Sequence, residues 1–215
     1  RQFNEFGIEI VGAPNPEADA EVIRLVYDIF SIMGIDQMQV KVNSIGGRES
    51  RSEYLKILDK AMEKQYDDLC PTCQKRYHKN LLRIFDCKNE QCQQILDVHA
   101  PAIIDHLNEE DSVHFAEVRQ LLDATNTPYT VDKKLVRGLD YYTKTTFEIT
   151  SNLLGSQDAI CGGGRYDHLV EDLDGKPTPA VGVACGMERL ILVLDELDAW
   201  EKEETTNIFF VTLGE

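Results

Sequence analysis

The sequence is short of three features. No apolar run reaches about 18 residues, so no membrane span is predicted. The N-terminal residues Arg1-Gln2-Phe3-Asn4 form no basic-then-apolar signal segment, and the chain holds no internal repeat or low-complexity tract. Basic residues are scarce, with 22 Lys and Arg against 38 Asp and Glu, a net charge of −16 over 215 residues. That charge excludes a chain coated for nucleic acid, whose affinity comes from neutralising phosphates, although a local basic patch is still allowed.

The chain also lacks an N-terminal methionine, which indicates that it starts inside a longer protein. Residues 208–213 form an apolar strand that ends almost as soon as it begins, so we expect the chain to be cut there too. Because no secretion signal is present, the six cysteines are expected in a reducing compartment, and the protein is expected to be cytoplasmic.

Hydrophobic periodicity predicts a strand–helix–strand unit, a helical insertion of about 80 residues, and then strands and a helix that resume the first layer. A packed core is affordable, since 42% of the residues are hydrophobic. We predict strands at 3–12, 38–43, 135–136, 141–149, 159–161 and 180–185. We predict helices at 16–33, 47–66, 93–107, 109–125 and 187–197, the last with Leu190, Ile191 and Leu194 inward. The expected units are 1–43, an insertion at 44–129, a resumed core at 130–197, and a linker with the start of another domain at 198–215.

The segment from Leu135 to Thr143 carries the sharpest chemical signal, because it joins an arginine to paired tyrosines at a strand entry. Arg137 offers a planar fork suited to phosphate or carboxylate oxygens. Tyr141 and Tyr142 offer flat apolar faces with a hydroxyl for orienting a ring. The alternative is an edge strand with a surface salt bridge and two core tyrosines.

Two further segments are suggestive but weaker on their own. The run Gly162-Gly163-Gly164 permits close backbone approach to a ligand, or else is simply a tight hairpin turn. Arg189 lies in the first turn of a predicted helix, where exposed amides and a cation meet an anion. The alternative for Arg189 is an ordinary helix start with a solvated Glu-Arg pair.

Four cysteines fall within 23 residues, in the pattern Cys70-x2-Cys73-x13-Cys87-x4-Cys92. This spacing is typical of a four-thiolate structural zinc site, which would staple an insertion with little core of its own. The alternative is four unligated cysteines in a helical insert. His78 and His99 are candidate substitute ligands, with solvated side chains as the favoured alternative. Cys161 and Cys185 are expected to be small core residues.

Taken together, four segments resemble the conserved segments of bacterial histidyl-tRNA synthetases, in the same order and spacing: residues 1–9, 135–142, 162–167 and 186–190. The resemblance implies an α+β fold of the class II aminoacyl-tRNA synthetase type, an antiparallel sheet flanked by helices with an inserted helical domain. It implies a homodimer that uses ATP and Mg²⁺ to convert L-histidine to histidyl-adenylate. The histidyl group then passes to tRNA(His).

The resemblance also assigns roles to residues. Arg137 resembles the catalytic arginine that holds the α-phosphate, where a preorganised guanidinium stabilises the charge that builds up in the transition state. Glu9 resembles the acidic residue that contacts histidine. Glu5 stands where the family commonly has Gln, and it would accept from the α-ammonium but repel the α-carboxylate. Tyr141 and Tyr142 resemble the pair that shapes the imidazole pocket, and as strand neighbours they are expected to point to opposite faces.

The remaining roles fall on the glycine run and the last helix. Gly163, Gly164 and Arg165 resemble the glycine-rich strand that floors the pocket. Arg189 resembles the motif 3 arginine that grips the γ-phosphate of ATP. Motif 1, the Thr-x-Glu loop and the first strand of motif 2 would precede Arg1, and the anticodon-binding domain would begin near Asn207. We therefore expect the isolated 215-residue chain not to adenylate histidine at a useful rate.

The insertion, about residues 44–128, lies where the family places a helical domain thought to reach the tRNA acceptor arm. A basic island around the cysteines would make that contact, unless it is simply a solvated face: Lys75, Arg76, Lys79, Arg83 and Lys88. The runner-up function is the non-catalytic, synthetase-like regulatory subunit of ATP phosphoribosyltransferase in histidine biosynthesis. That subunit is not expected to keep Arg137, the tyrosine pair and Arg189. A zinc-dependent RNA-binding module is a third reading, which leaves the Arg137 segment unexplained.

Overall fold

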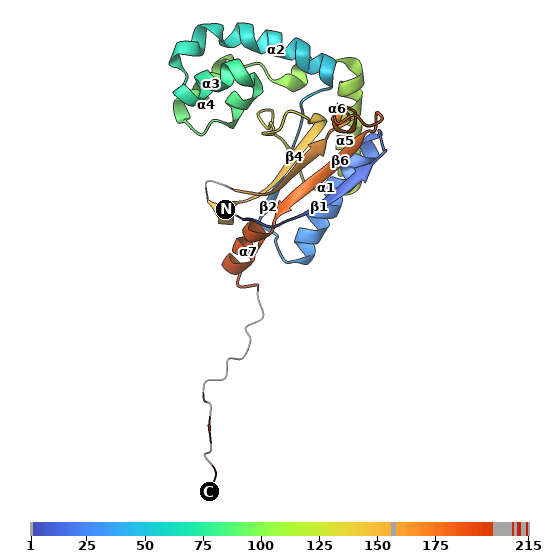
Figure 1. The fold of residues 1–215 in the computed structure, drawn as a ribbon, viewed down its shortest axis with the longest axis vertical. Helices are drawn as coiled ribbons and strands as arrows, with labels where there is room; N and C mark the ends of the chain where they lie inside the picture. Colours follow the sequence, from blue (N-terminus) through green and yellow to red (C-terminus); the bar gives the residue numbers. More distant parts are fainter. Residues whose placement is uncertain (1, 156–157, 200–207, 209, 212–213, 215) are drawn as a thin grey trace.

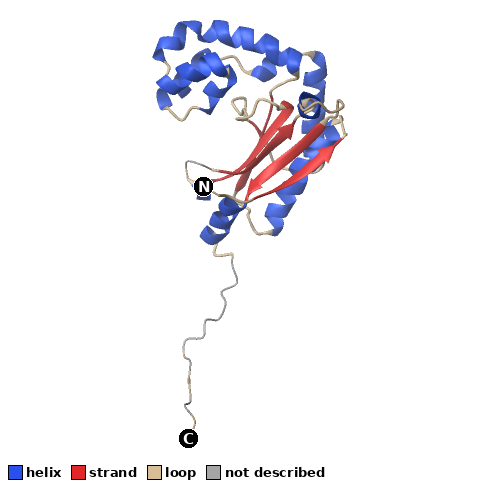
Figure 2. Ribbon diagram, in the orientation of Figure 1, coloured by secondary structure: helices blue, strands red, loops and turns tan. Residues whose placement is uncertain are grey.

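A six-stranded mixed sheet forms the centre of the computed structural model, which describes residues 2–155, 158–199, 208, 210–211 and 214 (Figure 2). Its strands are β1 (Glu5–Val11), β2 (Met38–Ser44), β3 (Thr130–Val131), β4 (Thr143–Ser151), β5 (Ala159–Arg165) and β6 (Ala180–Gly186). The strand order is β1-β6-β5-β4-β2-β3. All neighbours run antiparallel except β2 and β3, which are parallel. The expected α+β sheet flanked by helices is confirmed, with one parallel pair at its edge.

Two long helices, α1 (Pro16–Ile32) and α5 (Glu109–Ala124), cover one face of the sheet (Figure 1). Pro16 is at the first turn of α1, where its missing N–H costs nothing, and Glu17 lies at the positive end of the helix dipole. The inward residues of the two helices share one hydrophobic core with the strands: Val22, Ile23, Val26, Phe30, Phe115, Val118 and Leu122. The opposite face of the sheet therefore carries the polar and small residues.

The insertion forms a second, smaller layer near one end of the sheet (Figure 1). It contains α2 (Arg48–Met62), α3 (Pro71–Lys79) and α4 (Glu90–His99), linked by 3-10 turns at Glu63–Asp68, Leu81–Asp86 and Ile103–His106. A hydrophobic cluster of its own holds it together, including Tyr54, Leu58, Met62 and Leu96. The single helix predicted at 93–107 is wrong, because Pro101 lacks the N–H that would continue it.

The chain enters the insertion near Gly47 and leaves it near Asn108, and hydrogen bonds join these two points into what we call the closed neck. Gly46 turns the chain with φ 67°, and a Cβ there would lie 2.7 Å from Ser50 Cβ. Asp111 accepts from the Gly47 N–H at 2.7 Å and from the Ser50 hydroxyl at 2.5 Å. Ser50 in turn accepts from the Asn108 N–H at 3.0 Å. Because α5 follows this neck and packs in the sheet core, we propose that the insertion ends near residue 108 rather than at 129.

Several other local expectations differ from the structure. The glycine run 162–164 lies within β5 rather than in a turn, and 135–136 is not a strand. The short helix α6 (Leu169–Asp172) precedes β6, and α7 (Met187–Glu196) follows it. Leu190 and Leu194 are buried as predicted, but Ile191 is 42% exposed, because it points to the outer side of α7. The predicted 198–207 linker and 208–213 strand, like Arg1, lie largely outside the described residues.

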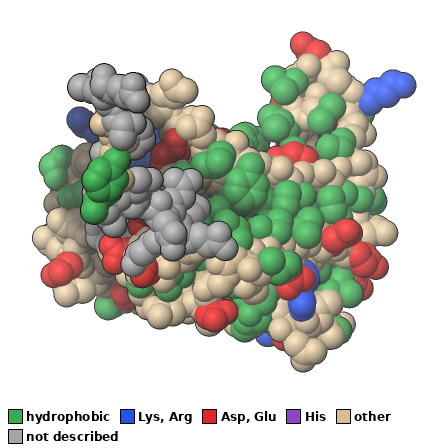
Figure 3. Space-filling model, turned by 90° about the horizontal axis from the view of Figure 1, so that it is seen from below, with side chains coloured by type: hydrophobic (Ala, Val, Ile, Leu, Met, Phe, Trp, Pro, Cys, Tyr) green, Lys and Arg blue, Asp and Glu red, His purple; other side chains and the backbone are tan. Residues whose placement is uncertain are grey.

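Among the described residues, no helix combines the length and the apolar character needed to cross a membrane. Figure 3 shows one face of the molecule, on which hydrophobic side chains gather and Lys and Arg are few.

Candidate functional site

The open face of the sheet, away from α1 and α5, is nearly bare of side chains at its centre. Strand pairing sets Gly7 opposite Ala184 and Ala184 opposite Gly162, while Gly182 lies opposite Gly164. Residues one position along, such as Val183, point into the core instead. The small residues leave a shallow floor on which larger groups from the surrounding segments can lie.

Arg137 lies on one side of this floor. Its guanidinium covers Gly162 so closely that an added Cβ would come within 2.5 Å of Cζ and Nη2. Its Nη1 donates to Glu148 Oε1 at 2.8 Å, and Glu148 is the β4 partner of Gly162. Burial raises the pKa of Glu148, and the Arg137 charge opposes that rise. The buried Nε of Arg137 has no hydrogen-bond partner among the described residues, which leaves a donor for an acceptor supplied by a ligand.

Glu9 and Tyr166 lie on the other side of the floor. The Glu9 carboxylate occupies the space that a Cβ on Gly182 would fill, and the Tyr166 hydroxyl donates to Glu9 Oε2. Burial, together with Glu9, raises the pKa of Tyr166 well above its ordinary value. Tyr141 packs edge-on against Tyr166 with ring centroids 5.8 Å apart, and burial raises its pKa to about 12. Both phenols are therefore neutral hydrogen-bond donors near neutral pH.

Tyr141 and Tyr142 lie together rather than on opposite faces. Their ring centroids are 4.6 Å apart, because both residues precede β4 in a turn where strand alternation does not apply. Tyr142 is buried against the insertion core and covers Gly164, whose added Cβ would lie 2.9 Å from Tyr142 Cδ1. Tyr141 thus faces Tyr166, and Tyr142 supports it from behind.

The other site residues predicted from the sequence are placed as follows. Glu5 is exposed on the same side of β1 as Glu9. Arg189 lies in the first turn of α7 and donates from Nη1 to the Ala159 carbonyl at 2.9 Å. An added Cβ on Gly163 would point to the core, 2.7 Å from Phe147 Cζ, and the role of Gly163 in histidine binding stays a prediction. The floor residues of β5 are Gly162 and Gly164, which the alternation of a strand would have indicated.

Arg165 belongs to the core rather than to the pocket. Its side chain is fully buried and donates to both carboxylate oxygens of Asp19, a residue of α1 that is also fully buried. It also donates to the carbonyls of Ala13 and Asn15 and to Asp167. Burial opposes the ionisation of Asp19, but the His114 ring, whose Nε2 lies 3.5 Å from Asp19 Oδ1, and the Arg165 guanidinium outweigh it, and the pKa of Asp19 is lowered. This ion pair locks α1 to the end of β5.

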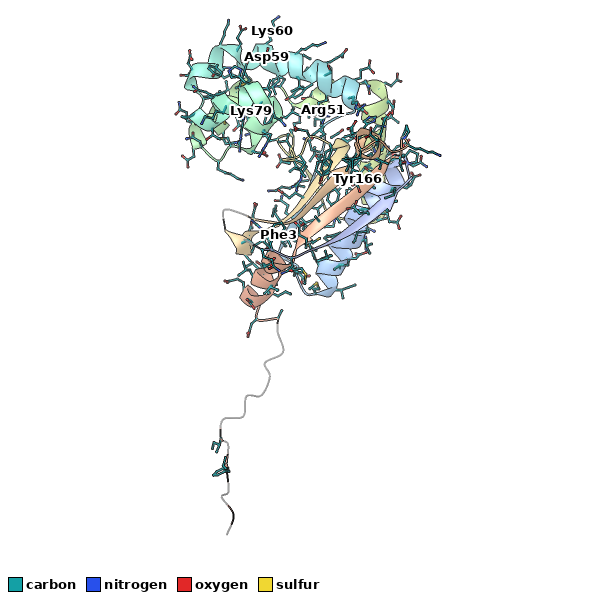
Figure 4. All side chains as sticks on the ribbon, viewed as in Figure 1. Phe3, Arg51, Asp59, Lys60, Lys79 and Tyr166 are labelled. Carbon is teal, nitrogen blue, oxygen red and sulfur yellow. The ribbon has the colours of Figure 1, made fainter. Side chains whose placement is uncertain are left out.

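The insertion contacts the loop that carries Arg137. Arg51 of α2 donates to the carbonyls of Asp140 at 3.2 Å and Tyr142 at 2.8 Å. Asn80 donates to the Asp140 carboxylate. Figure 4 places Arg51 between α2 and the sheet, whereas Lys60 lies on the far side of α2. The insertion thus holds the loop that carries Arg137 through these hydrogen bonds.

A cavity of about 570 Å³ lies where the insertion meets the sheet. Cys87 and Lys88 line one side of it, and Lys134 and Glu148 line another. Sequence reasoning had not identified Glu148, Tyr166, Gly182 or Arg51 as parts of the site. Only Gly182 carried a usable signal, the alternation along β6; the others depend on contacts between distant segments.

The four clustered cysteines converge inside the insertion. Their sulfur atoms all lie within 4.8 Å of one another, and the Sγ atoms of Cys70 and Cys87 are 3.8 Å apart. Among the described residues this is the one group of three or more side chains arranged as metal ligands. A hydrogen bond from the Cys73 N–H is the main reason that the pKa of Cys70 is lowered, to about 7.

Comparison with known proteins assigns the chain to a family. The family model described as Histidyl-tRNA synthetase matches residues 1–190. A histidine–tRNA ligase of Natranaerobius thermophilus is 43% identical over the whole chain and 51% of its own length. One from Desulfitobacterium hafniense is 49% identical over 89% of the chain and 45% of its own length. The crystal structure of apo S. aureus histidyl-tRNA synthetase matches with a TM-score of 0.73 and 40% identity, over 92% of this chain and 48% of that one. The chain spans about half the length of these relatives, and it belongs to the histidyl-tRNA synthetase family.

Proposed function

We propose that the protein containing this chain is a histidine–tRNA ligase, which activates L-histidine with ATP and transfers it to tRNA(His). The observation that carries the proposal is the open face, where Arg137 lies across the floor from Glu9 and Tyr166. A bare glycine floor between an arginine and a carboxylate–phenol pair suits a substrate with a phosphate at one end and a protonatable ring at the other. Activation of this kind occurs in the cytoplasm, where we place the protein.

On this proposal Glu9, Tyr141 and Tyr166 form the histidine pocket. Glu9 accepts from the imidazole N–H, and the neutral Tyr166 hydroxyl holds the carboxylate in place. Tyr141 offers its ring face, with Tyr142 packed behind it. Glu5 lies toward the substrate's α-ammonium, which its carboxylate would attract. The histidine α-carboxylate must then approach from the Arg137 side, away from Glu5.

ATP binding falls to Arg137 and Arg189. In adenylation an oxygen of the histidine carboxylate attacks the α-phosphorus, and the bond to the β,γ-pyrophosphate breaks. Negative charge builds on the α-phosphate oxygens, and the Arg137 guanidinium, held by Glu148 and by Gly162, stabilises it. Arg189, at the start of α7, is the proposed γ-phosphate ligand. In the second step the terminal ribose hydroxyl of the tRNA attacks the carbonyl, and AMP leaves.

Mg²⁺ would enter with ATP rather than occupy a site built by the described residues. Mg²⁺ prefers oxygen ligands and is commonly held by substrate phosphates with one or two carboxylates. No cluster of three or more carboxylates or histidines occurs in the described part of the chain. The four cysteines are a soft donor set that suits zinc rather than Mg²⁺.

The experiment is histidine-dependent ATP–pyrophosphate exchange by the full-length protein. Replacing Arg137 by alanine should lower kcat by about 100-fold or more, as removal of a transition-state donor does. Lys60→Ala, on the far side of α2, is the control and should match the wild type. Histidine binding by the wild type without any exchange would contradict the proposal and favour the regulatory-subunit function. The relatives named above support the ligase.

We further propose that the insertion contacts tRNA and that the full-length protein is a homodimer. Of the basic island, Lys75, Lys79 and Lys88 are exposed, whereas Arg76 is occupied by the Arg83 carbonyl. Changing the three exposed lysines to glutamate should weaken tRNA binding and leave exchange unaltered. Unchanged tRNA affinity would contradict this contact. Sedimentation of the full-length protein tests the dimer.

A further inference from the structure

We propose that Cys70, Cys73, Cys87 and Cys92 bind one structural zinc ion as four thiolates. The inference concerns the insertion and does not rest on the proposed function. The four residues come from three separate segments: the start of α3, the end of the 3-10 turn at Leu81–Asp86, and the first turn of α4.

The spacing of the sulfurs fits a tetrahedral ion. A Zn–S bond of about 2.3 Å gives an S···S edge of about 3.8 Å in a regular tetrahedron. The Sγ atoms of Cys70 and Cys87 are 3.8 Å apart, and all four lie within 4.8 Å. A disulfide would need about 2.05 Å. Closure around zinc thus asks for sulfur shifts of about 1 Å at most, within the reach of χ1 rotation.

Backbone amides are already aimed at the sulfurs. The Cys70 N–H points to Cys92 Sγ at 3.2 Å, and the Asn89 N–H points to Cys87 Sγ at 3.4 Å. The Asn89 side chain also caps α4 by accepting from the Cys92 N–H at 3.2 Å. Hydrogen bonds of this kind orient metal-bound ligands and stabilise their negative charge. An unligated set of thiols gains little from them.

Two comparisons within the chain sharpen the assignment. Cys161 and Cys185 are also buried, and they face each other across β5 and β6, yet they form part of the sheet core, and no third potential ligand among the described residues groups with them. His78, which the sequence allowed as a substitute ligand, instead lies against Tyr66 with its Nε2 3.2 Å from the phenolic oxygen. The donor set is therefore sulfur alone, which favours zinc over harder metals.

The net charge of residues 70–92 also fits a bound zinc tetrathiolate. Zinc with four thiolates carries a net charge of −2. Residues 70–92 hold five basic and two acidic side chains, a net of +3, in a chain whose total is −16. With the metal bound, the net charge of this segment becomes +1. We infer that the basic island serves in part as counter-charge to the metal centre, in addition to any contact it makes with tRNA.

The ion would hold the segments that support the Arg137 loop. Asn80, between the second and third cysteines, donates to Asp140, and Gln93, next to Cys92, accepts from Lys134. Gln93 also donates to the Cys87 carbonyl at 2.5 Å. Fixing Cys87 and Cys92 to one ion therefore fixes the contacts on both sides of the loop.

Zinc content of the full-length protein, purified without added metal or chelator, is the test. About one equivalent is expected for one tetrathiolate site. Replacement by cobalt should give the intense thiolate-to-metal absorption of a tetrahedral site. The matched variants are Cys73→Ala, which should lose the metal, and Cys161→Ala, which should keep it.

The wild-type measurement stands even if Cys73→Ala fails to fold. Less than about 0.2 equivalents of any metal would overturn the proposal. Iron in place of zinc would overturn the assignment of the ion, and equal metal loss from Cys161→Ala would overturn the assignment of the ligands. A disulfide within the quartet, detected by peptide mapping of the unreduced protein as a bond joining two of these four cysteines, would overturn both.

Discussion

Replacing Gly162 by alanine tests the proposed position of Arg137 without removing its charge. The new Cβ would lie 2.5 Å from Cζ and Nη2 of the guanidinium, whereas ordinary contacts begin at 3.4 Å. The guanidinium must therefore move by about 1 Å, and a displacement of that size commonly costs about 100-fold in rate. Because the obstacle is the flexible end of a side chain, stability should change little.

The assay is histidine-dependent ATP–pyrophosphate exchange by the full-length protein, with thermal unfolding measured alongside. We expect kcat to fall about 100-fold at an almost unchanged melting temperature. Gly138→Ala is the matched control next to Arg137 in sequence. Its Cβ would meet nothing closer than Arg83 Nη2 at 3.8 Å, so both quantities should stay near the wild-type values. Gly163→Ala should instead lower the melting temperature, because its Cβ would lie 2.9 Å from the Val183 backbone. A fully active Gly162→Ala enzyme would refute the placement of Arg137 as the adenylation arginine.

Three more outcomes follow from the contacts of the site and the core. Asp19→Asn removes the fully buried carboxylate partner of Arg165, leaves Asp167 alone to compensate its charge, and should cost about 3–5 kcal/mol in denaturant unfolding. Asp28→Asn, on the same helix but in an exposed ion pair, should cost less than about 1 kcal/mol, and equal costs would contradict the reasoning. Because the folded pKa of Asp19 is lowered, its contribution is present above the unfolded value of 3.8 and is lost as pH falls through the folded value, so the difference between wild type and Asp19→Asn should shrink below pH 3.8. Tyr166→Phe removes the donor to Glu9 and should raise KM for histidine about tenfold with kcat less affected, whereas an unchanged KM would argue against this pocket.

Hydrophobic periodicity correctly predicts most strands and helices that have one buried face. The alternation along β1 correctly set Glu5 and Glu9 on one side, and the apolar run of β6 was recognised as a strand. It misled at the glycine run, since glycine marks turns and close-packed strands alike. Periodicity also misleads at Tyr141 and Tyr142, because β4 begins at Thr143, two residues after the predicted start at 141.

Contacts between segments that lie far apart in the chain could not be predicted from the sequence. Nothing in the local pattern pairs Arg165 with Asp19, which lie 146 residues apart, or draws Arg137 to Glu148 rather than to solvent. The cysteine quartet is the exception. The spacing alone predicts that the four sulfurs meet in space, because cysteine pairs at such separations are typical of metal ligands.

The closed neck at Gly47, Ser50 and Asp111 determines which part of the chain can vary during evolution. Entry and exit of the insertion are held together by Asp111, while β2, α5 and β3 form one continuous crossover beneath it. A segment attached in this way can lengthen, shrink or be exchanged without shifting the register of any strand, because loop length adds little to the cost of closure. The same attachment allows the insertion to vary while the glycine floor of the sheet stays unchanged.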